Sequence, residues 1–305
     1  MSGSYGQADE NESIATIHRA LELGCNLLDT ADEYGAGHNE TLLGKALAGR
    51  RQQAIVATKF GFVFDAEGKV RGRDASPAHV QAACEASLRR LQTDYIDIYY
   101  LHRVDPAVAI EDTVGAMAKL VKDGKVRHLG LSEASADLIR RAHAVHSIAV
   151  LQSEYSLWTR DPERDVIPFC RELGIAFVAF SPLGRGFFTG RLRRESMAED
   201  DFRRAMPRFE NENFLRNLEL LKTIERLARV RRRTPAQIAL AWVLSRGEHV
   251  FAIPGTRGIP HLEENLQARD VELSQEEIRC LDEAFAPGAF AGERYAANSQ
   301  FKPDA

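Results

Sequence analysis

Segments with helical periodicity alternate with short apolar runs along almost the whole chain, and this alternation limits the possible fold more than any other feature. Seven apolar runs are expected strands: residues 25–28, 54–58, 95–101, 127–131, 149–152, 175–180 and 250–253. Helices are expected before six of them, at residues 12–23, 39–48, 77–91, 110–122, 135–145 and 162–172, and a pair of helices precedes the seventh. Apolar strands separated by helices predict a parallel sheet covered by helices.

The number of expected strands is one short of a closed barrel. A (β/α)8 barrel needs eight parallel strands, but here the first repeat contributes only its helix. Residues 1–11 are rich in Ser, Gly, Asp and Glu, which predicts a loop. We therefore expect a (β/α)8 TIM barrel without its first barrel strand, formed as a single domain by residues 1–305. Either the natural start lies upstream of Met1, or two strand edges of the barrel are exposed.

Composition narrows the classes of function. The 305 residues are 44% hydrophobic, enough to bury a large core. The 40 basic and 44 acidic residues give a net charge of -4, so we expect a small-molecule ligand and neither nucleic acid nor a membrane as partner. The cysteines stand far apart without a CxxC pair, which predicts neither a disulfide framework nor a metal site. Without a signal peptide or a long apolar run, the chain is predicted to be cytoplasmic.

Four polar side chains fall just past three of the expected strands. Asp29 and Tyr34 follow the first strand, Lys59 the second and His102 the third. Because the carboxyl ends of barrel strands lie at one face, where such barrels keep their chemistry, we expect these side chains to lie together. Each of these residues alone could have a purely structural role. A structural role at all four positions at once is harder to accept, so their grouping favours a catalytic site.

The four residue types suit the reduction of a carbonyl group by hydride transfer. Such a reaction needs a proton at the carbonyl oxygen, and Tyr34 can donate it if its pKa is brought down from about 10. We expect Lys59 to lower that pKa, Asp29 to keep Lys59 charged, and His102 to bond to the substrate oxygen. A barrel aldolase with Lys59 as the Schiff-base amine is an alternative.

These segments resemble the aldo-keto reductase family, in particular the branch with the Tyr-Tyr-Leu-His-Arg phrase found here at residues 99–103. The resemblance runs from Ser2 to about Ala268. It implies a (β/α)8 barrel that binds NADPH without a Rossmann fold, with Asp29, Tyr34, Lys59 and His102 as the catalytic tetrad. It also implies that the amino-terminal hairpin and first strand of the family have no counterpart in this sequence.

The resemblance further implies a nicotinamide site and a pyrophosphate loop. The nicotinamide residues implied are Ser132, Glu133, Gln152 and Phe180. Many family members carry Asn where this chain has Glu133, so that position departs from the pattern. The implied pyrophosphate loop is Ser181, Pro182, Leu183, Gly184, Arg185 and Gly186, whose backbone amides and arginine suit anionic oxygens.

A third segment resembles the adenosine site of the family. Its residues are Gly255, Thr256, Arg257, Glu264 and Asn265. Thr256 and Arg257 suit a 2'-phosphate, and this favours NADPH over NADH.

Two long segments fit no repeat. The polar stretch from Gly186 to about Asn213 is interpreted as a lid over a ligand. Residues 287–305 show no regular pattern, and either pack over the barrel mouth or are disordered.

The chain is thus predicted to be an NADP-dependent oxidoreductase that reduces an aldehyde or a ketone to an alcohol. The alternative is an NADPH-binding regulatory or interaction protein with little turnover, because relatives that share this barrel serve as potassium channel β subunits. The sequence identifies neither the substrate nor the oligomeric state.

Overall fold

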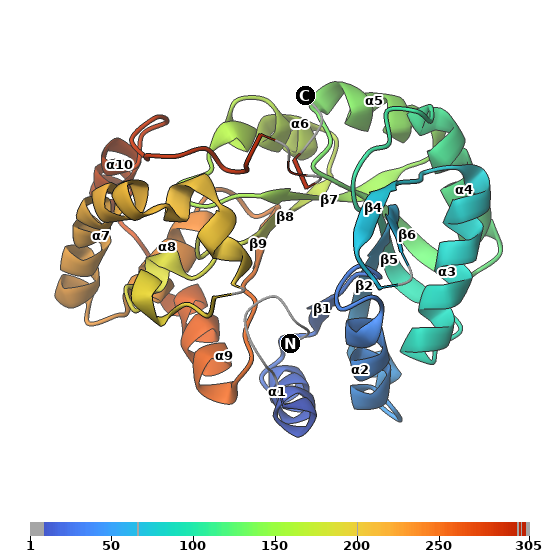
Figure 1. Cartoon of the computed structure of the whole chain (residues 1–305), viewed down its shortest axis with the longest axis horizontal. Helices are drawn as coiled ribbons and strands as arrows, with labels where there is room; N and C mark the ends of the chain where they lie inside the picture. The colour runs from blue at the N-terminus through green and yellow to red at the C-terminus, as the bar shows by residue number, and fades with distance from the viewer. Residues whose placement is uncertain (1–8, 66, 200, 298, 300, 303–305) are drawn as a thin grey trace.

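The computed structural model describes residues 9–65, 67–199, 201–297, 299 and 301–302, and confirms the parallel barrel (Figure 1). Seven parallel strands form one sheet in the order β1-β2-β5-β6-β7-β8-β9. Their bounds are β1 Leu27–Asp29, β2 Ile55–Phe60, β5 Ile96–Leu101, β6 Val126–Ser132, β7 Ile148–Glu154, β8 Ala176–Phe180 and β9 Val250–Ile253. In the described part of the chain β1 and β9 are the two ends of this order, so the barrel is nearly closed and open between them.

Helices surround the sheet. Their bounds are α1 Glu10–Glu22, α2 His38–Ala46, α3 Pro77–Leu91, α4 Ile110–Lys122, α5 Ala136–Val145, α6 Val166–Glu172, α7 Asn211–Arg231, α8 Pro235–Leu244, α9 Ile259–Leu266 and α10 Gln275–Ala284. Local signals set several starts: Thr234 caps α8 with Gln237 in a capping box, and Pro235 occupies the first turn. The expected loop at residues 1–11 ends early, because α1 begins at Glu10; residues 1–8 lie outside the described residues.

The two-residue period of the strands separates an inner from an outer face. Inside the barrel, Ala57, Ile98, Tyr100, Val150 and Val178 form a small apolar cluster. Towards the carboxyl ends, the same alternation reaches polar and aromatic residues: Asp29, Lys59, His102, Ser132, Gln152, Glu154 and Phe180. The interior therefore changes from apolar to polar along its axis.

The interior is closely filled near Tyr100. Gly130 lies opposite Tyr100 in the β5–β6 register, and a Cβ atom at Gly130 would lie 2.4 Å from Cδ1 of the tyrosine. Only glycine therefore allows the Tyr100 ring to occupy this place in the barrel.

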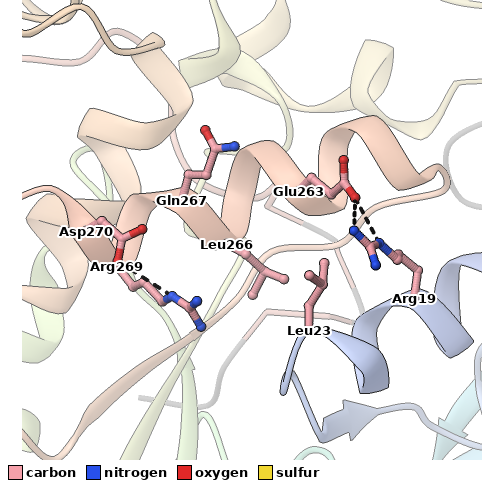
Figure 2. Close-up of a pocket in the computed structure, with 7 residues that line it drawn as sticks. All are labelled: Arg19, Leu23, Glu263, Leu266, Gln267, Arg269 and Asp270. Atoms are coloured by element: carbon pink, nitrogen blue, oxygen red, sulfur yellow. Dashed lines mark hydrogen bonds and ion pairs between the residues drawn. The ribbon is translucent and has the colours of Figure 1, made fainter.

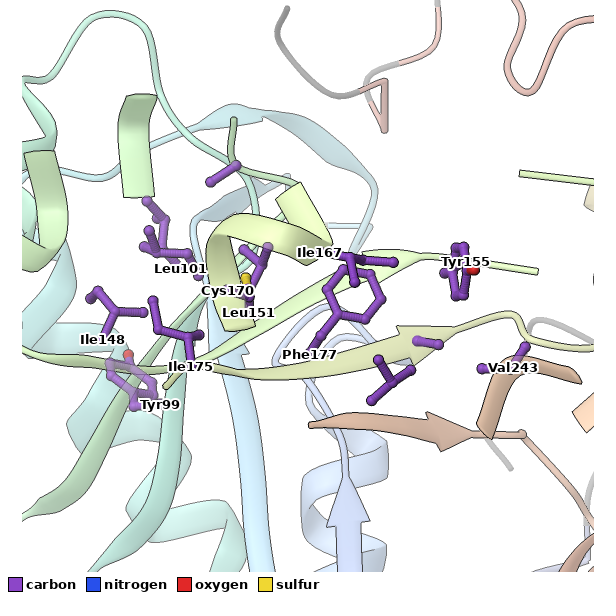
Figure 3. Packing of buried hydrophobic residues seen from close by; sticks show 14 of the residues in the cluster. Tyr99, Leu101, Ile148, Leu151, Tyr155, Ile167, Cys170, Ile175, Phe177 and Val243 are labelled. Atoms are coloured by element: carbon purple, nitrogen blue, oxygen red, sulfur yellow. The ribbon is translucent and has the colours of Figure 1, made fainter. Parts of the chain in front are cut away.

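The outer face of the sheet packs against the helices. Figure 3 shows Leu151 and Phe177 of the strands beside Ile167 and Cys170 of α6, in the larger of the two apolar clusters formed by the described residues. Burial of these side chains stabilises the barrel and fixes the position of the strands relative to the helices.

Two features at the barrel mouth differ from the expectations. After β2, the chain forms an antiparallel hairpin, β3 Phe62–Phe64 and β4 Val70–Arg73, which was not predicted. The expected lid is a series of short 3-10 turns, here called the covering segment (residues 187–199 and 201–209). Its Phe187 and Phe209 rings pack on Trp158, with centroids 4.7 and 5.5 Å away. Aromatic packing therefore holds this polar stretch on the barrel.

The last segment packs over the barrel mouth, one of the two outcomes expected for it. We call residues 287–297, 299, 301 and 302 the tail; the other residues beyond 287 lie outside the described part. Phe290 packs on Phe285, and Phe301 packs on Phe62 of the hairpin with centroids 5.4 Å apart. Between these contacts, Arg294 of the tail pairs with Glu133 and Glu154 at the carboxyl ends of β6 and β7.

Candidate active site

Lys59 lies at the centre of the four residues expected to form the tetrad. Its Nζ donates hydrogen bonds to Oδ1 of Asp29 and, over 2.8 Å, to the carbonyl oxygen of Thr30. The phenolic oxygen of Tyr34 lies 3.4 Å from the same Nζ. The Lys59 side chain is 0% exposed, so its charge acts on Asp29 and Tyr34 with little screening by water.

Burial reverses the expected pKa of Tyr34. Lys59 was expected to lower this pKa below its ordinary value, but burial of the phenol outweighs Lys59, and the pKa of Tyr34 is raised. Burial alone would lower the pKa of Lys59, but Asp29 and Tyr34 raise it overall. At neutral pH, the phenol therefore keeps its proton and the amine its charge.

His102 lies beside the phenol, with its ring centroid 6.0 Å from that of Tyr34. Burial, together with Arg103 and Lys59, holds the pKa of His102 well below its ordinary value, so the ring is neutral. Its Nδ1 is buried and has no hydrogen-bond partner within the described part of the chain. A neutral imidazole here can bond to a carbonyl oxygen without adding charge.

Gln152 is joined to the same group. Its Nε2 donates a 2.7 Å hydrogen bond to Oδ2 of Asp29, so the carboxylate is held between Lys59 and Gln152. Ser132 lies opposite Gln152 in the β6–β7 register, and its Oγ accepts a 3.3 Å bond from Arg103. Of the four expected nicotinamide residues, Gln152 therefore bonds directly to the tetrad, and Ser132 lies beside it on the neighbouring strand.

Phe180 ends β8 with a half-buried ring. The guanidinium carbons of Arg103 and Arg294 lie 6.0 and 5.7 Å from its centroid. Glu133, the departure from the family pattern, follows β6 with φ at +58°. Its carboxylate pairs with Arg294 over 2.8 Å and accepts a 2.7 Å bond from the Glu154 amide.

The expected pyrophosphate loop is a tightly folded turn. The φ angle is positive at Ser181 and at three consecutive residues, Gly184, Arg185 and Gly186, and the Gly184 and Gly186 amides donate to carbonyl oxygens within the loop. Pro182 is buried and Leu183 half-buried. Arg185 reaches Glu154 at 3.0 Å and the Tyr295 hydroxyl at 3.2 Å, so in this structure its side chain bonds to the protein itself.

The expected adenosine residues lie at either end of α9: Gly255, Thr256 and Arg257 precede it, and Glu264 and Asn265 belong to its last turn. Gly255 and Arg257 are exposed, while Thr256, Glu264 and Asn265 are half-buried. Arg191 of the covering segment lies 3.4 Å from Glu264, which brings that segment over this site. Exposed Arg257, half-buried Glu264 and the nearby Arg185 together suit a long, anionic nucleotide, so the residues present fit NADPH.

Sequence reasoning missed Glu154 and two arginines that surround it. Arg294 lies 3.0 Å from the Glu154 carboxylate and Arg208 lies 3.9 Å from it. Burial alone would raise the pKa of Glu154, but Arg294, Arg185 and Arg208 lower it to about 2. Glu154 could have been found, because it shares the inner face with Gln152; the irregular tail gave no signal for Arg294.

A cavity of ≈ 290 Å³ lies elsewhere, between α1 and α9. Figure 2 shows Leu23 and Leu266 facing each other across it, with Arg19 bonded to Glu263. None of the expected site residues lines it.

Within the described residues, no group of three or more His, Cys, Asp or Glu is placed to hold a metal ion. In the same part of the chain, no helix has both the length and the apolar character needed to cross a membrane.

Comparison with known proteins places this arrangement in a family. The chain is 48% identical over 299 residues to probable aldo-keto reductase 1 of Glycine max, covering 97% of this chain and 86% of that protein. It superposes on the glycerol dehydrogenase AKR11B4 of Gluconobacter oxydans with a TM-score of 0.85 and 33% identity, over 93% of this chain and 88% of that one.

A further solved relative was crystallised with the cofactor that the sequence predicts. The aldo/keto reductase of Klebsiella pneumoniae in complex with NADP and acetate has a TM-score of 0.73 and 31% identity, over 96% of this chain and 91% of that one. The sequence model of the Aldo/keto reductase family matches residues 1–286. The chain belongs to the aldo/keto reductase family, whose oxidoreductases use NADP(H).

Proposed function

We propose that this chain reduces an aldehyde or a ketone to an alcohol with NADPH, and that Tyr34 donates the proton. One observation carries the proposal: a protonated phenol lies 3.4 Å from a fully buried ammonium, beside a neutral imidazole. An acid, a cation that can stabilise its conjugate base, and an uncharged hydrogen-bonding group are together what carbonyl reduction requires.

Bound NADPH supplies the hydride, and the protein supplies the proton and the geometry. Tyr34 donates its proton to the carbonyl oxygen as negative charge develops there. Lys59 stabilises the phenolate that remains, and Asp29 keeps Lys59 charged and oriented. His102 positions the carbonyl oxygen for this transfer.

The cofactor would extend across the carboxyl ends of β6 to β9. Ser132, Gln152 and Phe180 would hold the nicotinamide, and the loop at residues 181–186 would hold the pyrophosphate. Thr256, Arg257, Glu264 and Asn265 would hold the adenosine and its 2'-phosphate, which is the basis for proposing NADPH over NADH.

The test is to follow NADPH oxidation with a panel of aldehydes and ketones, using the parent chain and Tyr34→Phe. The expected result is loss of turnover by at least about 10²-fold in Tyr34→Phe, because the proton donor is gone. Fluorescence titration should give nearly the same NADPH affinity for both proteins, since the proposed cofactor residues are intact.

Tyr95→Phe is a matched control, because Tyr95 lies between Arg51 and Arg127, away from the proposed site. Equal loss of NADPH affinity and turnover in Tyr34→Phe would contradict the assignment of Tyr34 as the acid. Tight NADPH binding by the parent without turnover on any carbonyl would favour a regulatory or interaction protein.

A further inference from the structure

We propose that the charge of Arg294 sets the relative affinity of this site for the reduced and the oxidised cofactor. The inference rests on the proposed function, because it takes Phe180 as the ring beside which the nicotinamide binds. It concerns the tail, a part of the chain for which the sequence indicated no role.

Two carboxylates lie buried at the carboxyl ends of β6 and β7. The side chains of Glu133 and Glu154 are 3% and 2% exposed. The backbone amide of Glu154 donates a 2.7 Å hydrogen bond to Oε1 of Glu133, which ties the two residues together. Two buried negative charges this close need cations beside them.

Arg294 is the cation that serves both carboxylates. Its Nη1 lies 2.8 Å from Oε2 of Glu133, and its Nε lies 3.0 Å from Oε2 of Glu154. Its guanidinium carbon is 5.7 Å from the centroid of the Phe180 ring. The charge of Arg294 is therefore close to any ring that packs against Phe180.

The position of Arg294 is fixed by how the tail is anchored. Asn217 of α7 donates to the Ala291 carbonyl over 3.0 Å and accepts from the Ala291 amide over 2.9 Å. Gly292 has φ at +88°, and a Cβ there would lie 2.6 Å from the carbonyl oxygen of Pro207. Farther along, Arg103 bonds to the Phe301 carbonyl. The tail is thus held on both sides of Arg294.

The local charge balance is positive. Arg185 and Arg208 also face Glu154, at 3.0 and 3.9 Å, so three arginines surround the two carboxylates. An oxidised nicotinamide ring carries a positive charge, whereas the reduced ring is neutral. A net positive environment therefore weakens binding of NADP⁺ more than binding of NADPH, which favours release of the oxidised cofactor after reduction.

The test is to measure the dissociation constants of NADPH and NADP⁺ separately, by fluorescence and by calorimetry. Arg294→Gln should lower the ratio of the NADP⁺ constant to the NADPH constant by about tenfold, roughly the effect of one unit charge about 10 Å away at an effective dielectric constant near 20. Glu133→Gln should raise the same ratio by a similar factor. The double variant Glu133→Gln/Arg294→Gln should return it to within about threefold of the parent.

Two controls separate charge from structure. Arg294→Lys keeps the charge and should keep the ratio. Arg160→Gln removes an arginine of similar burial, 11% exposed against 16%, that pairs with Glu163 and Asp282 away from Phe180; it should leave the ratio unchanged.

Several results would overturn the inference. If Arg294→Gln weakens both cofactors by the same factor, Arg294 has a structural role only. If Arg294→Gln does not fold, an unchanged ratio in Glu133→Gln is sufficient to reject the inference. Failure of the parent to bind either cofactor would overturn the proposed function as well, whereas normal binding with an unaltered ratio in the variants overturns this inference alone.

Discussion

The two sides of the barrel mouth hold their buried charges differently. On the proton-donor side (Asp29, Tyr34, Lys59 and His102), one cation and one carboxylate pair directly, and both come from neighbouring strands. On the arginine side (Glu133, Glu154, Arg185, Arg208 and Arg294), the carboxylates lie at the carboxyl ends of β6 and β7, whereas the cations come from the turn after β8, the covering segment and the tail. Sheet register positions the first side, whereas loop packing positions the second.

The largest effect is expected on the proton-donor side, from Lys59→Met. The substitution leaves Asp29 buried without its cation, so the free energy of unfolding should fall by about 3–5 kcal/mol. Turnover should fall by roughly 10²–10⁴-fold, because the ammonium no longer stabilises the phenolate. Urea unfolding and steady-state kinetics measure the two effects.

Lys45→Met is the control, since Lys45 pairs with Glu10 at the surface and should contribute less than about 1 kcal/mol. Adding Asp29→Asn to Lys59→Met should restore part of the stability but not the turnover. Equal losses of stability in Lys45→Met and Lys59→Met would show that the buried pair contributes no more to stability than the surface pair.

The next effect is a loss of stability in acid caused by the arginine side. The folded pKa of Glu154 is lowered to about 2 from an ordinary 4.5, so its stabilising contribution is present above pH 4.5 and is lost as pH falls towards 2. The full loss is about 3 kcal/mol. Urea unfolding of the parent between pH 5 and pH 2.5 should show it, and Glu154→Gln should show a smaller change.

Glu277→Gln is a useful comparison for this prediction. Arg231 also lowers the pKa of Glu277 to about 2, but this pair lies at the surface and is screened by water. Its acid-dependent contribution should stay below about 1 kcal/mol. If Glu154 and Glu277 make equal acid-dependent contributions to the free energy of unfolding, burial does not strengthen the ion pairs of the arginine side.

An effect of opposite sign is expected next to Tyr34. Burial and then Glu40 raise the pKa of Asp32 to about 8, and its Oδ1 has no hydrogen-bond partner within the described residues. Because this folded pKa is raised, stability is lost as pH rises from about 4 to about 8. Asp32→Asn should remove that loss, which amounts to about 5 kcal/mol by pH 8 and shrinks towards pH 4.

Asp105→Asn tests whether the gain belongs to Asp32. Asp105 is equally buried, but its carboxylate accepts hydrogen bonds from the amides of Ala75 and Ala107. Its amide variant should lose stability at every pH. A gain in both variants would show that the missing partner of Asp32 is not the cause.

The smallest effect tests the tail alone. Asn217→Ala removes the reciprocal bonds to Ala291 and should lower the free energy of unfolding by about 1–2 kcal/mol. Hydrogen exchange should become faster in the tail and stay unchanged in β1, β2 and β5. Asn213→Ala, which removes a single bond to Pro207, should leave exchange in the tail unchanged. Faster exchange in β2 would mean that the two sides are not independent.

The sequence predicted the strand-borne part of this molecule well, because strand residues obey a short period. The seven strands were found with small shifts at their ends, and the position of each polar residue after its strand indicated the barrel mouth. Asp29, Lys59 and His102 could therefore be grouped from the sequence alone. Their roles remain proposals.

The loop-borne part could not be predicted in the same way. Arg294 is recognisable only through contacts with Glu133 and Glu154, which lie more than a hundred residues earlier. The β3–β4 hairpin was missed because each of its strands is very short. The pKa of Tyr34 was expected in the wrong direction, since a sequence shows a neighbouring lysine but not the depth of burial that outweighs it.

The anchored tail has a consequence for the order in which the molecule is made. Synthesis runs from the amino end, so the strands that carry Glu133 and Glu154 leave the ribosome long before Arg294 does. Until then, the nascent barrel has two carboxylates without their shared cation. The arginine side can therefore be completed only after translation has passed residue 294, and shorter products of interrupted translation would retain the strands but lack this part of the site.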